Sequence, residues 1–131
     1  MKYAIEKEGV FIPSFNGNKN LSEKDQITVT YRYPTMAALK RCRKKPQAKG
    51  IANANGGIER LEIAIEKDDD AVIRELLVSI KNCSCVCEGK ESHIVTAGDL
   101  FDAPVQLAPL YKEIAAEFDR ILDQADISEK N

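Results

Sequence analysis

The strongest constraint on the fold is an amphipathic pattern near the C-terminus. Over residues 106–124, apolar side chains recur at the i, i+3, i+4, i+7 spacing of one helix face. The stripe comprises Leu107, Leu110, Tyr111, Ile114, Ala115, Phe118, Ile121 and Leu122. Pro109 falls in the first turn, where proline is tolerated. The rest of the chain must therefore supply a surface that buries this helix face.

Two shorter helices are predicted between residue 67 and this long helix. Asp68-Asp69-Asp70 offers a capping carboxylate and places negative charge at the positive end of a helix dipole. Apolar residues follow at helical spacing and predict a helix over 69–82. Thr96 and Asp99 form a Thr-x-x-Asp capping box, which predicts a short helix over 97–102.

The N-terminal half reads mainly as strands. Period-two alternation is clearest at 27–33, and similar patterns occur at 3–12 and 59–66. We expect these three segments to form a small antiparallel sheet in which 59–66 pairs with 27–33. A short helix over 35–45 and a small-residue loop over 47–57 lie between them.

The elements together predict an α+β fold in one domain. Its small antiparallel sheet in the N-terminal half packs with a C-terminal helical subdomain. The length of 131 residues fits a single domain with a modest core. Within 1–131, residues 1–66 are expected to be β-rich, 67–125 helical, and 126–131 a frayed polar tail.

The overall charge and hydrophobicity limit the expected compartment and partners. The net charge of −2 provides no global field for nucleic acid or anionic membrane. No apolar run approaches the ~20 residues that span a bilayer, so no membrane association is expected. The first residues turn polar before an apolar signal segment forms. These observations indicate the cytoplasm, where the four cysteines are expected to be reduced thiols.

The connector over 83–95 contains a Cys-x-Cys-x-Cys run. In a strand, Cys83, Cys85 and Cys87 would face one way, with His93 nearby. These four residues form one hypothesis, a zinc-binding adaptor, although the spacing departs from the Cys-x2-4-Cys of structural zinc sites. The alternative is that reduced cysteines serve as small apolar core residues. No cofactor is expected on that interpretation.

A basic run follows the predicted strand 27–33. It supports a second hypothesis, a small nucleic-acid-binding or regulatory module. It lacks interleaved aromatic residues for base stacking, and it equally fits a solvated helix end. Nucleic acid is therefore not the expected partner. The candidate residues are Lys40, Arg41, Arg43, Lys44 and Lys45.

No set of acid, base and nucleophile stands out, so an enzyme is not expected. The amphipathic helices instead favour a protein-binding role, because apolar area beyond what a small sheet can cover is available to a partner. The candidate contact residues are Leu76, Leu77, Leu110, Ile114 and Phe118.

The order of elements resembles the tail assembly chaperones of long-tailed bacteriophages and prophages. The resemblance rests on a strand ending in Tyr33-Pro34-Thr35, the Glu88-Gly89-Lys90 connector, the segment 96–100, Pro104, and the last helix with Leu110-Tyr111-Lys112-Glu113-Ile114. It implies a non-catalytic protein of the host cytoplasm that binds other tail proteins, the tape-measure protein and tail-tube subunits, during assembly. Such proteins also self-associate, which makes a homo-oligomer one expectation. The three cysteines and the basic run depart from what the resemblance implies.

Overall fold

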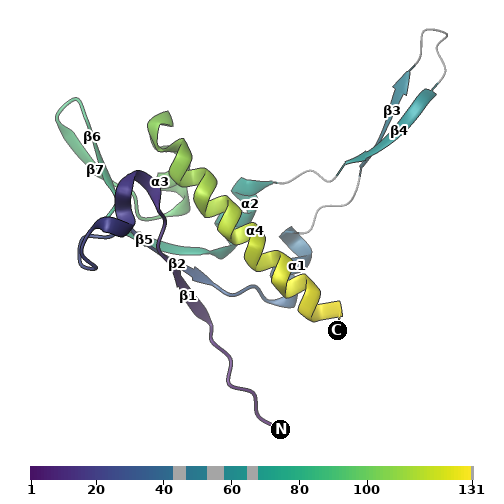
Figure 1. Cartoon of the computed structure of the whole chain (residues 1–131), viewed down its shortest axis with the longest axis horizontal. Helices are drawn as coiled ribbons and strands as arrows, with labels where there is room; N and C mark the ends of the chain where they lie inside the picture. Colours follow the sequence, from purple (N-terminus) through teal and green to yellow (C-terminus); the bar gives the residue numbers. More distant parts are fainter. Residues whose placement is uncertain (43–46, 53–57, 65–67, 131) are drawn as a thin grey trace.

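The computed structural model has the α+β fold that the sequence predicts. It describes the backbone of residues 1–42, 47–52, 58–64 and 68–130, and the side chains of residues 1–42 and 68–125. In Figure 1, the long C-terminal helix lies across a small sheet, and shorter helices flank it.

The central sheet has three antiparallel strands. β2 (Thr28–Arg32) lies between β1 (Glu8–Phe11) and β5 (Leu77–Lys81). Val29 and Tyr31 are buried on one face, as the alternation predicts. Strand β1 is shorter than the predicted 3–12, because the residues before Glu8 form no strand. In Figure 1 this N-terminal segment extends away from the body of the molecule.

Strands β3 (Gln47–Ala52) and β4 (Ile58–Ala64) pair with each other in a separate antiparallel sheet. The expected pairing of 59–66 with 27–33 is therefore wrong, since β5 occupies the edge of β2 that this pairing needed. The predicted loop over 47–57 is also wrong for residues 47–52, which lie in β3. Residues 53–57 and 65–67 lie outside the described part of the chain.

Helix α1 (Met36–Cys42) begins where predicted. The hydroxyl of Thr35 accepts a hydrogen bond from the backbone N of Ala38 at 3.0 Å, which caps the helix. The end of the predicted helix 35–45 falls partly on residues 43–45, which lie outside the described residues.

Helix α2 (Asp69–Leu76) continues directly into β5, so the prediction of one helix over 69–82 is wrong at its C-terminal half. The carboxylate of Asp68 caps α2 by accepting from the backbone N of Ala71 at 3.1 Å. Leu77 and Ile80 fit a helical period, but they also fill the core from a strand. Pairing with β2, with Ile80 opposite Val29, satisfies the backbone groups on that edge.

The predicted connector 83–95 contains a hairpin of β6 (Ser84–Cys87) and β7 (Lys90–His93). Its two-residue turn has positive φ at both positions, 52° at Glu88 and 80° at Gly89. This is the primed turn geometry that matches the twist of two paired strands, and glycine adopts it without strain.

Helix α3 (Ala97–Phe101) starts at the predicted capping box, with the Thr96 and Asp99 side chains each accepting from the other's backbone N. The short 3₁₀ helix η2 (Val105–Leu107) leads into α4 (Ala108–Lys130). The predicted frayed tail is wrong for residues 126–130, which continue α4. No glycine or proline follows Gln124 to end the helix.

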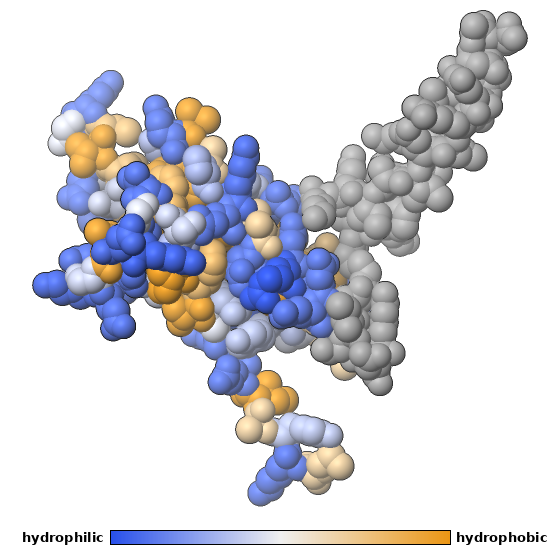
Figure 2. All heavy atoms as spheres, in the orientation of Figure 1, coloured by the Kyte–Doolittle hydropathy of each residue, from blue (hydrophilic) through white to orange (hydrophobic). Residues whose placement is uncertain are grey.

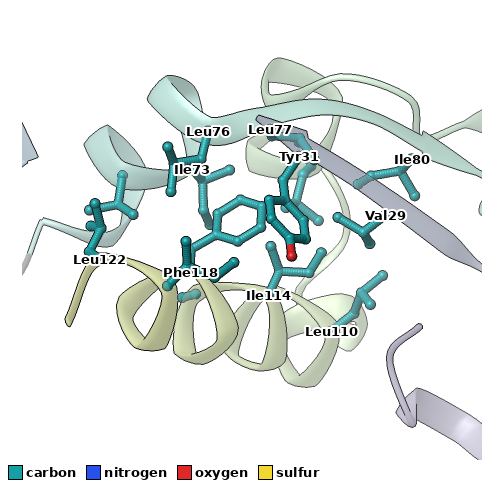
Figure 3. Close-up of a cluster of buried hydrophobic side chains, with 14 of the residues drawn as sticks. Val29, Tyr31, Ile73, Leu76, Leu77, Ile80, Leu110, Ile114, Phe118 and Leu122 are labelled. Atoms are coloured by element: carbon teal, nitrogen blue, oxygen red, sulfur yellow. The ribbon is translucent and has the colours of Figure 1, made fainter. Parts of the chain in front are cut away.

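The core lies between α4, α2 and the sheet. Figure 3 shows the Tyr31 and Phe118 rings side by side at its centre, with centroids 5.8 Å apart and planes at 60°. This edge-on arrangement is favourable for aromatic pairs. The fully buried apolar side chains that surround them are Val29, Ile73, Leu76, Leu110 and Ile114.

The segment before β2 folds around one buried polar side chain. Asn18, in the 3₁₀ helix η1 (Phe15–Asn20), is 2% exposed. Its amide nitrogen donates to the carbonyls of Pro13 at 2.8 Å and Ile27 at 3.0 Å, and its oxygen accepts from the Ile27 backbone N at 2.6 Å. These bonds join the two ends of the segment that connects β1 to β2.

Candidate functional site

The five predicted contact residues lie in the core. Leu76, Leu110, Ile114 and Phe118 are 0% exposed, and Leu77 is 6% exposed. Figure 3 shows their side chains directed into the space between α4 and the sheet. In this conformation the five side chains are part of the core and are not accessible to a partner. A contact surface would therefore lie at the margin of the apolar stripe of α4.

One such margin is a pocket beside the first turn of α4, here called the α3–α4 pocket. It has a volume of about 190 Å³ and opens to the surface. Val105, at its edge, is 80% exposed. Its lining includes Phe101, Ala103, Pro104, Val105, Leu107 and Tyr111, with Asp70 at one side.

Aromatic and charged groups fix the shape of the α3–α4 pocket. The rings of Phe101 and Tyr111 meet edge-on with centroids 6.4 Å apart, and the guanidinium of Arg74 lies 4.9 Å from the Phe101 centroid. The Tyr111 hydroxyl donates to the Asp70 carboxylate. Burial, and then the bond to Asp70, raises the pKa of Tyr111 above its usual range.

One acidic side chain, Asp70, lines the α2 side of this pocket. The adjacent Asp69 has an oxygen, Oδ1, that is buried without a hydrogen-bond partner among the described residues. An oxygen of this kind costs stability unless a donor reaches it. The pocket therefore combines apolar walls with one carboxylate, Asp70, at its side.

A second open pocket, of about 280 Å³, lies between the end of β2 and α4. Tyr31 and Tyr33 line it, and their ring centroids are 5.4 Å apart. Burial is the main cause that raises the pKa of Tyr31 to about 12, followed by a hydrogen bond with Tyr33. The ion pair of Arg120 with Glu117 lies beside these rings.

The basic candidates are only partly described. Lys40 is exposed, whereas Arg41 forms an ion pair with Glu75 that joins α1 to α2. The hydrogen bond from Arg41 lowers the pKa of Glu75. Candidates Arg43, Lys44 and Lys45 lie outside the described residues.

The predicted zinc residues are only partly brought together, because Cys85, Cys87 and His93 line one cavity and Cys83 does not. Cys83, Cys85 and Cys87 share one face of the β6–β7 hairpin, but Cys83 is buried in the core, Cys85 is half-buried and Cys87 is exposed. His93 stands opposite Ser84 in the ladder, and it also lines the cavity that Cys85 and Cys87 share. Over the described ranges, no group of three or more His, Cys, Asp or Glu could hold a metal ion.

Sequence reasoning missed the α3–α4 pocket. Two apolar residues outside the helix stripe could have indicated it. Phe101 follows the capping box, and Val105 precedes the last helix. A second missed feature involves Glu113, which lies outside the apolar stripe of the last helix. In the structure, the Glu113 carboxylate accepts from the backbone N of Ser14 and, at 3.2 Å, from its hydroxyl. This contact attaches the start of η1 to α4.

Comparison of the chain with protein-family models, with curated proteins and with solved structures finds no match. Among the described helices, none is long and apolar enough to cross a membrane.

Proposed function

We propose that this protein is a non-catalytic tail assembly chaperone of a phage or prophage, which binds other tail proteins during assembly. The α3–α4 pocket is the docking site, and its occupant is an apolar helix of the tape-measure protein. The single observation that carries the proposal is the open apolar pocket beside α4, with Phe101 and Tyr111 in its wall and Val105 exposed at its edge.

Two features of the pocket support a helical occupant. Protein-binding grooves for amphipathic helices are lined by apolar and aromatic side chains that receive one or two anchor residues. The Asp70 carboxylate at one side of the pocket suits a basic residue next to the apolar anchor on the partner helix. The element order described above supplies the expectation that this partner is a tail protein.

The test is co-expression of the full chain with a helical fragment of a phage tape-measure protein. The soluble yield of the fragment should rise in the presence of the chain. Replacing Val105 by Asp should lower this yield and weaken the complex about tenfold or more, because a carboxylate would enter an apolar contact.

Val86→Asp is the matched control, since Val86 is 68% exposed on β6 and does not line the pocket. Circular dichroism should show that both variants fold as the wild type does. An unchanged fragment yield with the wild-type chain, or equal losses in the two variants, would contradict the proposal.

A further inference from the structure

The run of three thiols is a motif that the proposed function does not use. It lies on one face of the β6–β7 hairpin, where exposure increases from Cys83 to Cys85 to Cys87. The backbone N of Ile94 donates to the carbonyl of Cys83 at 2.8 Å, which continues the strand pairing by one residue pair. Both residues are buried, so this end of the hairpin is attached to the core. The tight turn at Glu88 and Gly89 fixes the other end. The spacing of the thiols is therefore set by the paired strand β6.

Cys85 and Cys87 share one open cavity. Its volume is about 310 Å³, and Ser92, His93, Asp99 and Asp102 also line it. The two thiols lie on the same face of β6, because residues two apart in a strand point to the same side, and both line this cavity. The two aspartates make the cavity favourable for a cation.

We propose that Cys85 and Cys87 form a two-thiolate site for a soft monovalent metal ion of the Cu(I) type. Thiolates are the protein ligands that select soft ions, and two ligands suffice for Cu(I) but not for tetrahedral zinc. Binding forms two sulfur–metal bonds and releases the two thiol protons to water. The ion keeps its oxidation state, so no oxidant or reductant takes part.

The strand geometry favours an ion between the sulfurs over a disulfide. Residues two apart in a strand have Cα atoms about 6.6 Å apart, at the upper limit for a disulfide. Their Cβ atoms also point the same way, so a bond of about 2.05 Å between the sulfurs would require the backbone to move. With metal–sulfur bonds near the zinc–thiolate length of about 2.3 Å, a bridging ion needs sulfurs only about 4.6 Å apart.

The test is a titration of the reduced full-length protein with Cu(I) held by a coloured chelator, under anaerobic conditions. The wild type should remove one ion per chain from the chelator. Cys87→Ser should weaken the binding of Cu(I) about 100-fold, because the variant keeps a single thiolate, and a single ligand lacks the effective concentration that a second linked ligand provides. The Cys87 side chain is exposed, so this variant should keep the wild-type circular dichroism spectrum.

Cys42→Ser is the matched control, because Cys42 is a half-buried thiol on α1 that does not line the cavity. It should leave the affinity unchanged. X-ray absorption of the loaded protein should show two sulfur atoms around the ion. Failure of the wild type to compete, equal affinity in Cys87→Ser, or three or more sulfur neighbours would overturn the proposal. None of these results depends on whether the chain binds a tail protein.

Discussion

Replacing Asn18 by Ala should be among the most destabilising single changes outside the apolar core. The side chain makes three hydrogen bonds at 2.6–3.0 Å, to Pro13 and Ile27, and it is only 2% exposed. At about 1 kcal/mol of net stabilisation for each bond, the expected loss is about 3 kcal/mol. This is a large fraction of the ~5–15 kcal/mol that holds a domain of this size together.

The assay is urea unfolding followed by far-ultraviolet circular dichroism. With a denaturant slope of about 2 kcal/mol/M, the midpoint should fall by about 1.5 M while the slope stays constant. Ser22→Ala is the control, because its hydroxyl bonds to Asp25 at 2.8 Å on an exposed surface. It should change the stability by less than about 0.5 kcal/mol. A loss below about 1 kcal/mol for Asn18→Ala would refute the view that this side chain holds the β1–β2 connection.

Two further predictions concern Tyr31. A Cβ added at Gly9 would lie 2.5 Å from Cζ of the Tyr31 ring, so Gly9→Ala should displace the ring and cost about 1–3 kcal/mol in urea unfolding. Gly98→Ala, whose added Cβ would meet only Thr96 Oγ1 at 3.7 Å, should not destabilise, and equal losses at the two glycines would contradict the reasoning. Tyr31→Phe should change the alkaline behaviour, because the pKa of Tyr31 is raised from its usual 10.0 to about 12 in the folded protein. The stabilising contribution of the neutral phenol is full below pH 10 and is lost as the pH rises through 12. The wild type should therefore lose stability relative to Tyr31→Phe over this window. Parallel curves of unfolding free energy against pH for the two proteins would exclude the effect.

The elements that could be predicted from the sequence are those defined by local signals. The capping box at Thr96 and Asp99, the cap at Asp68 and the alternation of Val29 and Tyr31 each involve residues a few positions apart. The stripe of the last helix has the same local character. Such patterns fix an element without information from the rest of the chain.

What could not be predicted is the choice among distant partners. The alternation over 59–66 indicates a strand, but it does not distinguish pairing with β2 from pairing with β3. Ile80 similarly fits a helical period and a strand, and only its place opposite Val29 decides between them. These alternatives differ in long-range contacts, which no short window of sequence contains.

The candidate contact residues show the same limit. Leu110 and Phe118 were identified correctly as the apolar face of a helix, but the sequence does not show how much of this face the sheet covers. In the structure the sheet and α2 cover all of it at these positions. At the α3–α4 pocket the open apolar area includes Val105 and Phe101, which belong to no periodic pattern.

The direct junction of α2 and β5 restricts where the length of this chain can vary. Leu76 is the last residue of the helix and Leu77 is the first of the strand, and both are buried. One inserted residue would rotate α2 by about 100° relative to β5, or turn every side chain of β5 to the opposite face. Either result removes a leucine from the core. Homologous chains should therefore accept insertions and deletions before Glu8, but keep the distance between α2 and β5 constant.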